Sequence, residues 1–150
     1  MILQLKKLHP EGMIIMLVSS NLFKKSSKSR KVRCEICANY CKIADGSYGI
    51  CKQHKNINGE LFDESFGVVS SLNVDPIEKK PLYHFLPGTL TYSVGGFGCN
   101  MGCLHCQNYM ISQEFDKISD RFNILPETIV ENAINQGCKS IAWTYNEPTI

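Results

Sequence analysis

Residues 89–108 read TLTYSVGGFGCNMGCLHCQN, an apolar run followed by three closely spaced cysteines. The run Thr89–Val94 is rich in β-branched and aromatic residues, which favours a β-strand. The glycines after it permit a tight loop in which the backbone can approach a ligand closely. Cys99, Cys103 and Cys106 are therefore predicted on a loop just past the C-terminal end of a strand.

A helix and a second strand are predicted after this loop. PETIVENAINQG, residues 126–137, begins with a proline, has apolar residues at helical spacing and ends with a glycine. KSIAWTY, residues 139–145, is the second strand, and Asn146 and Glu147 follow it directly. The three elements form a βαβ unit with parallel strands. The thiols and the Asn146–Glu147 pair are then expected at the same sheet edge, which is where α/β proteins bind ligands.

The three-cysteine loop lacks a fourth thiol for a closed tetrahedral zinc site. An iron–sulfur cluster of the [4Fe–4S] type, held by three thiolates, would have one iron open to an external ligand. His105 adjoins Cys106, which is a poor geometry for both side chains to bind one ion. A catalytic zinc with an open position stays an alternative at this point.

A second cysteine cluster, CEICANYCKIADGSYGIC, spans residues 34–51. Its four thiols can surround a tetrahedral Zn²⁺ or hold an iron–sulfur cluster, and the turn residues DGSYG let the chain fold back on itself. So short a segment buries too little apolar surface to fold alone, so a metal would supply the missing stability. The predicted ligands are Cys34, Cys37, Cys41 and Cys51.

The amino-acid composition and the cysteine spacing indicate the general class of protein and its compartment. The chain has 150 residues, 43% of them hydrophobic and 20% charged, as in soluble globular proteins, and its net charge of +2 does not by itself indicate nucleic-acid binding. C-x-x-C spacings without a good secretory signal indicate metal ligands in a reducing compartment, which predicts a cytoplasmic protein. The apolar run Met13–Val18 is far shorter than the roughly 20 residues of a membrane span, so no membrane contact is predicted.

Three segments carry a resemblance to a known family. They are DPIEKKPLYHFLPG at 75–88, GCNMGCLHCQNYMIS at 98–112 and YNEPTI at 145–150. The cysteine spacing resembles the CxxxCxxC signature of radical SAM enzymes. The surrounding text is similar to the radical SAM member of the AmmeMemoRadiSam group, which is related to glycyl-radical-enzyme activases such as pyruvate formate-lyase activating enzyme. Members of that group also carry an N-terminal four-cysteine segment.

The resemblance implies a function and roles for individual residues. Cys99, Cys103 and Cys106 would hold the [4Fe–4S] cluster, and S-adenosylmethionine (SAM) would chelate its fourth iron. Reductive cleavage of SAM would then give a 5′-deoxyadenosyl radical that abstracts hydrogen from a substrate. Asn146 and Glu147 match the place of a Gly-Gly-Glu motif that contacts the methionine part of SAM. His105 stands where the superfamily usually has Phe or Tyr near the adenine.

The partners implied are SAM, an electron donor such as flavodoxin or ferredoxin, and a substrate that is a protein, an RNA or a small molecule. Zinc or a second iron–sulfur cluster is implied at the four-cysteine segment. Two alternative functions are an iron–sulfur or zinc binding module without SAM chemistry and an RNA-modifying radical SAM protein. The RNA alternative draws on the basic stretch at 24–33, which is more typical of a solvated linker.

The predicted fold class is α/β, namely the N-terminal part of a partial (β/α)₆ radical SAM barrel preceded by a small cysteine-rich metal-binding segment. The predicted domains are a leader and basic linker at 1–33, the four-cysteine segment at 34–56 and the start of the radical SAM core at 57–150. Because such a core needs further βα units, the chain is expected to be a fragment of a longer protein or to be completed by another chain.

Overall fold

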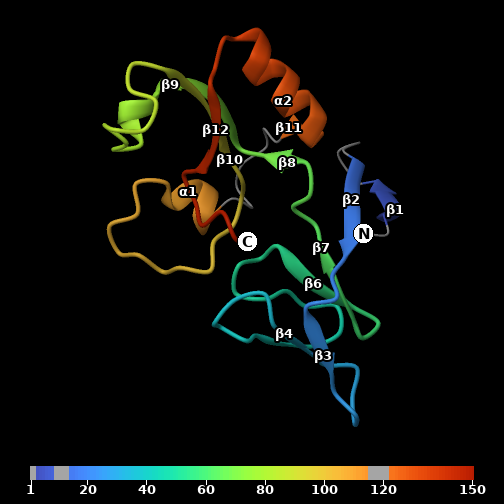
Figure 1. Ribbon diagram of the computed structural model, residues 1–150. Coiled ribbons are helices and arrows are strands. Elements are labelled where there is room, and N and C mark those ends of the chain that lie inside the picture. The colour runs from blue at the N-terminus through green and yellow to red at the C-terminus, as the bar shows by residue number, and fades with distance from the viewer. Residues whose placement is uncertain (1–2, 9–13, 115–121) are drawn as a thin grey trace.

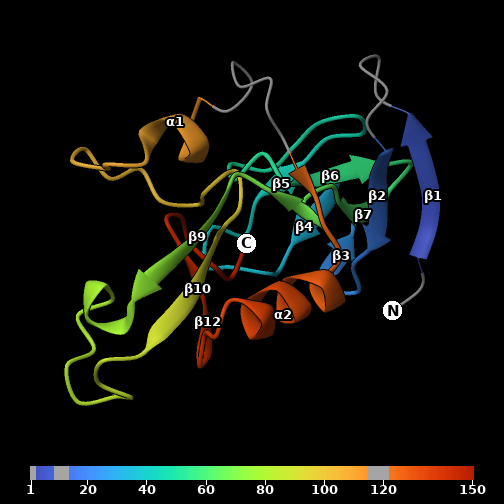
Figure 2. The same ribbon diagram turned by 90° about the horizontal axis from the view of Figure 1, so that it is seen from above.

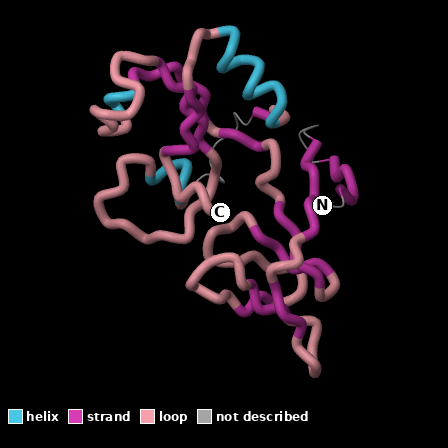
Figure 3. Tube along the Cα trace, in the orientation of Figure 1, coloured by secondary structure: helices cyan, strands magenta, loops and turns pink. Residues whose placement is uncertain are grey.

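The computed structural model describes residues 3–8, 14–114 and 122–150. Short strands joined by long loops dominate these residues, and they form four small sheets (Figures 1 and 3). The strands are β1 (Leu3–Leu8), β2 (Ile14–Ser19), β3 (Phe23–Lys25), β4 (Val32–Cys34), β5 (Lys42–Ile43), β6 (His54–Ile57), β7 (Glu60–Asp63), β8 (Val68–Val69), β9 (Ser71–Pro76), β10 (Leu90–Gly95), β11 (Phe122–Asn123) and β12 (Ser140–Thr144). The helices are η1 (Ile77–Lys79), α1 (Tyr109–Ser112) and α2 (Pro126–Asn135).

The predicted start of a (β/α)₆ barrel is wrong. Within the described residues the central sheet has the order β12-β10-β9, and β9 pairs with β10 in the antiparallel direction. The other sheets are antiparallel and small. Three prolines at 76, 81 and 87 prevent a crossover helix between β9 and β10, so the chain turns back beside β9. The Ile77 N–H donates to the Thr89 carbonyl at 2.9 Å and closes this turn.

The local predictions around the three-cysteine loop are confirmed. β10 and β12 are parallel neighbours, and α2 connects them, beginning at Pro126. In Figures 1 and 2 this helix runs beside both strands. Tyr92 and Val94 of β10 pack with Ile129 and Ala133 of α2 in the main hydrophobic core. This packing buries one face of the sheet, and the βαβ unit fixes where the loop after β10 begins.

The side chains on the opposite face of the central sheet are small and polar. The strand register places Asp75 beside Thr91 and Asn73 beside Ser93, so these four residues lie on one face. Thr91, Ser93 and Asp75 are nevertheless buried. A buried polar face needs hydrogen-bond partners within the protein, and the site described below supplies them.

The first part of the chain forms two further sheets, β1-β2-β7-β6 and β3-β4-β5, in the lower and right-hand part of Figure 1. Asn58 and Gly59 have φ of 54° and 85° and join β6 to β7 in a two-residue hairpin turn. The basic stretch at 24–33 lies mostly in the β3–β4 hairpin. In the described part of the chain, no helix is both long and apolar enough to cross a membrane.

Candidate functional site

The three cysteines of the CxxxCxxC loop lie between β10 and α1, just past the end of a strand, as the sequence predicts. Cys99 is buried, Cys106 is half-buried and Cys103 is exposed. The Met101 N–H donates to the Cys99 sulfur at 3.4 Å. The Cys106 thiol lies 3.9 Å from the Ser112 hydroxyl oxygen of α1. Each thiol thus differs in its access to solvent and in its partners.

Asn146 holds the beginning of this loop. Its side-chain oxygen accepts from the Gly96 N–H at 3.2 Å, and its side-chain nitrogen donates to the Gly98 carbonyl at 2.7 Å. The Gly98 N–H in turn donates to the Ile111 carbonyl at 2.8 Å. Further along the loop, the Asn108 side chain donates to the Tyr145 carbonyl at 2.9 Å. The segment after β12 therefore fixes both ends of the cysteine loop.

Asn146→Ala is expected to lower the free energy of unfolding by about 2 kcal/mol, because it leaves half-buried backbone groups of the loop without partners. The measurement is a urea titration, compared with Asn135→Ala. Asn135 is an exposed residue in the last turn of α2, where alanine is a better helix former, so that variant should lose no stability. Equal losses in the two variants would show that the bracing hydrogen bonds contribute nothing measurable.

The other two residues that are predicted to contact SAM, His105 and Glu147, differ in their exposure to solvent. His105 is exposed, whereas Glu147 is half-buried. The Glu147 carboxylate accepts from the Thr149 hydroxyl at 2.7 Å, which is a contact within its own turn. Glu147 also lines a cavity of about 240 Å³ together with Phe97 and Asn146. The structure thus brings Asn146 and Glu147 to the root of the loop and His105 to its outer part.

The four-cysteine segment folds as the β4–β5 ladder and the turn before β6. The Cys34 N–H donates to the Cys41 carbonyl at 2.9 Å, and the Cys51 sulfur lies 3.4 Å from His54 Nδ1. Burial raises the pKa of the Cys34 thiol, and the negative charges of the other three thiolates raise it further. A bound cation would reverse the effect and favour all four thiolates.

The cysteine side chains are of the right type to bind a metal, but in the described part of this structure they are not close enough together to do so. Among residues 3–8, 14–114 and 122–150, no three Cys, His, Asp or Glu side chains are grouped closely enough to hold an ion. The chemistry of the donors does fit, because both candidate sites consist of thiols, which are the usual ligands of zinc and of iron–sulfur clusters. No helix or strand lies between Gly96 and Asn108, so closing the loop around a cluster would break no backbone ladder.

The two cysteine segments touch each other, which the sequence analysis did not foresee. Gly98 has φ of +74°, and a Cβ placed on it would overlap the Cys51 carbonyl and lie 2.5 Å from Gln53 Nε2. The Asn39 side chain donates to the Asn100 carbonyl at 3.0 Å, and the Lys52 ammonium donates to the Gln113 carbonyl at 2.9 Å. The only trace of this contact in the sequence is a glycine directly before Cys99.

A buried carboxylate on the polar face of the central sheet was also missed. Asp75 accepts from Lys79 at 2.7 Å, from Lys80 at 3.0 Å and from the Ser93 hydroxyl at 2.6 Å. Burial disfavours the ionised form, but the hydrogen bonds from two ammonium groups and a hydroxyl outweigh it and hold the pKa of Asp75 well below its ordinary value. A signal was present in the sequence, because an aspartate stands near the end of the run that forms β9 and two lysines follow shortly after it.

Comparison with known proteins gives one informative relative. Over 130 residues, or 86% of this chain, the sequence is 48% identical to "Uncharacterized protein MJ0808" of Methanocaldococcus jannaschii. The alignment covers 39% of that protein, so the chain spans about two fifths of its length. No protein-family model matches the chain. No solved structure matches it either.

Proposed function

We propose that this chain is the cluster-binding part of a radical SAM enzyme, in which Cys99, Cys103 and Cys106 hold a [4Fe–4S] cluster. The observation that carries the proposal is the loop itself, which places three thiols within eight residues directly after β10. Three thiolates leave one iron of a cube-shaped cluster open to a further ligand, which suits SAM. The resemblance of the loop and of residues 145–150 to radical SAM enzymes supports the same function.

The residues around the loop have separate tasks in this proposal. When bound, the cluster and SAM supply a one-electron cleavage that gives a 5′-deoxyadenosyl radical for hydrogen abstraction, with an electron donor such as flavodoxin or ferredoxin. Glu147 would bind the amino group of SAM through a charge-assisted contact, and His105 would contact the adenine. Asn146 acts as a positioning residue, because its amide is already bonded to the backbone at Gly96 and Gly98.

The four-cysteine segment binds zinc or a second iron–sulfur cluster in this proposal. Burial and the charges of neighbouring thiolates raise the pKa of Cys34 and Cys51, so a cation among the four sulfurs would remove an unfavourable interaction as well as add new bonds. Because this segment packs against Gly98, its metal also supports the loop that carries Cys99.

The test is anaerobic reconstitution with iron and sulfide, followed by EPR of the dithionite-reduced chain with and without SAM. SAM is expected to shift the signal of the reduced cluster, and Cys99→Ala is expected to abolish both the signal and the shift. Cys34→Ala should remove metal from the four-cysteine segment, which elemental analysis measures. Cys138→Ala is the matched control, because this half-buried cysteine lies between α2 and β12, away from both clusters in sequence.

Two results would contradict the proposal. If a cluster forms but its EPR signal is the same with and without SAM, the chain is an iron–sulfur binding module without SAM chemistry. If Cys99→Ala and Cys138→Ala bind the same amount of iron as the unaltered chain, the loop does not hold the cluster.

A further inference from the structure

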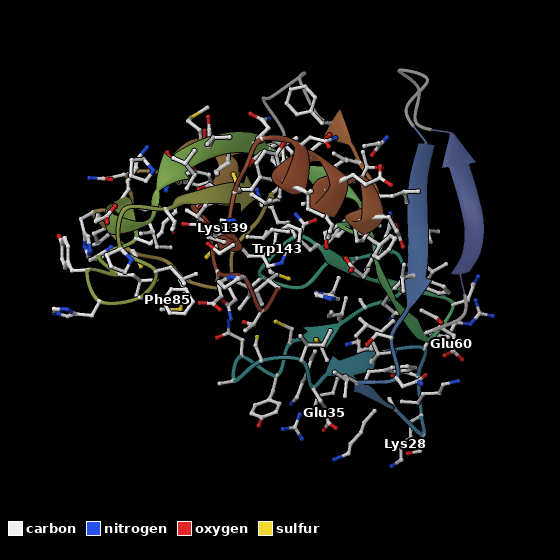
Figure 4. The ribbon with its side chains drawn as sticks, turned by 45° about the horizontal axis from the view of Figure 1, so that its top comes forward. Lys28, Glu35, Glu60, Phe85, Lys139 and Trp143 are labelled. Atoms are coloured by element: carbon white, nitrogen blue, oxygen red, sulfur yellow. The ribbon has the colours of Figure 1, made fainter. Side chains whose placement is uncertain are left out.

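A second cavity, of about 580 Å³, lies between the segment that follows β9 and the strand β12. Its walls include Lys79 and Lys80, the aromatic residue Phe85 on the loop after η1 (Figure 4), the edge of β12, and Asn108 of the cysteine loop. Trp143 of β12 pairs with Val94, so its side chain lies on the α2 face of the sheet, opposite Asp75. Because Asn108 stands two residues after Cys106, the cavity adjoins the loop of the proposed cluster.

The charges at this cavity do not balance. Asp75 is only 4% exposed and carries one negative charge, whereas Lys79 and Lys80 carry two positive ones. The pKa of Asp75 lies well below its ordinary value, so the carboxylate stays ionised near neutral pH. Each ammonium has three N–H donors and gives one to Asp75, so donors remain for another partner. The Lys79 side chain is 62% exposed, which leaves its ammonium accessible.

Tyr145 completes one wall in a strained conformation. Its φ is +75°, in the left-handed region that residues with a Cβ rarely adopt. The Tyr145 hydroxyl donates to Asp75 at 3.3 Å and accepts from the Asn73 side chain at 3.2 Å, and the Lys80 ammonium lies 5.3 Å from the centre of its ring. Strain of this kind persists where the surroundings fix it, and it is concentrated at functional sites.

We propose that this cavity binds an anionic organic molecule, with a carboxylate or phosphate group on Lys79 and Lys80 and a flat apolar part against Phe85. One uncompensated positive charge beside an aromatic wall has this complementarity. The cavity adjoins the cysteine loop, so the bound molecule is the substrate of the enzyme. That last assignment rests on the proposed function, whereas the binding itself needs neither a cluster nor SAM.

The test uses phenyl phosphate and benzoate as anionic probes and phenol as the uncharged probe. Binding is followed by ¹H–¹⁵N NMR without SAM or reductant, through the backbone N–H signals of Lys79 and Lys80 and the side-chain amide of Asn108, which line the cavity. Both anions are expected to shift these signals to saturation, and phenol is expected to bind more weakly. The stronger of the two anions identifies whether a phosphate or a carboxylate is preferred.

Lys79→Gln is expected to weaken binding of the better anion by about tenfold, because a charge-assisted contact is lost. Lys79→Arg keeps the charge and should retain most of the affinity. Lys24→Gln is the matched control, because Lys24 is an exposed lysine paired with Glu35 at 2.9 Å in the β3–β4 hairpin, and its loss should leave binding unchanged. The spectra of the unliganded variants show whether each one is folded.

Two outcomes would overturn the inference, namely no saturable shift with either anion, or equal binding of the anion by Lys79→Gln and the unaltered chain. Neither outcome depends on the cluster, so the NMR experiment tests the anion site and the EPR experiment with SAM tests the proposed function independently. Conversely, anion binding in a chain whose cluster ignores SAM would leave the site in place and remove only its role as the substrate site.

Discussion

Replacing Gly98 by alanine is expected to lower the free energy of unfolding by about 3 kcal/mol. Part of the loss comes from the backbone, because φ of +74° is unfavourable for a residue with a Cβ by roughly 1 to 2 kcal/mol. The rest comes from overlap, because the new methyl group would meet the Cys51 carbonyl and the side chain of Gln53. The Cys51 carbonyl is part of the main chain and cannot turn away without moving the four-cysteine segment.

Gly88→Ala is the matched control for this prediction. Gly88 has the same φ of +74°, but a Cβ placed on it meets nothing within 4 Å, so its variant reports the backbone cost alone. A urea titration of both variants should show the larger loss at Gly98, and elemental analysis after reconstitution should show less iron in that variant. If the two variants lose the same stability, the two cysteine segments do not pack as described.

Asp75→Asn is expected to lower the free energy of unfolding by about 3 kcal/mol at neutral pH. Asparagine keeps the shape of the side chain but removes the negative charge, which leaves the poorly exposed Lys80 ammonium without its counter-charge. Glu35→Gln is the control, because it removes a carboxylate from the exposed ion pair with Lys24. Such a surface pair contributes at most about 1 kcal/mol. If Asp75→Asn and Glu35→Gln lowered the free energy of unfolding equally, the burial of Asp75 would not strengthen its ion pairs.

The effect of Asp75→Asn should also depend on pH in a defined direction. The pKa of Asp75 is lower in the folded chain than the ordinary value of about 4 in the unfolded chain. The carboxylate therefore stabilises the fold fully above that ordinary value, and the stabilisation declines as the pH falls toward the folded pKa. The difference between the unaltered chain and Asp75→Asn should be constant from about pH 7 to about pH 5 and shrink toward pH 2. A difference that does not change over this range contradicts the assignment of a lowered pKa.

The elements that the sequence predicts well are those with local causes. The β-branched run at 89–94 forms β10, the proline-led apolar pattern at 126–137 forms α2, and the Asn58–Gly59 pair forms a two-residue hairpin turn. Each depends on side chains that are near one another in the chain. The position of three cysteines after a strand follows from the same local pattern, so the root of the candidate site was predictable.

The arrangement of the sheets was not predictable by the same means. The prolines at 76, 81 and 87 exclude a helix between β9 and β10, but the strand with which β9 pairs, and the direction of that pairing, depend on contacts across the chain. A family resemblance suggested a barrel, and the pairing of β9 overturns it for the described residues. The contact of Gly98 with Gln53 and the ion pairs of Asp75 are also contacts between separate segments. Spacing within one segment carries no information about such partners.

The contact between the two cysteine segments has a consequence for how the protein can vary between species. The acceptors at Asn100 and Gln113 are main-chain carbonyls, whereas the donors at Asn39 and Lys52 are side chains. A carbonyl is present whatever residue occupies the position, so position 100 can change its side chain and keep its hydrogen bond. Positions 39 and 52 cannot do so without losing theirs. Selection on these two hydrogen bonds therefore falls on the side chains at positions 39 and 52, which belong to the four-cysteine segment and its continuation.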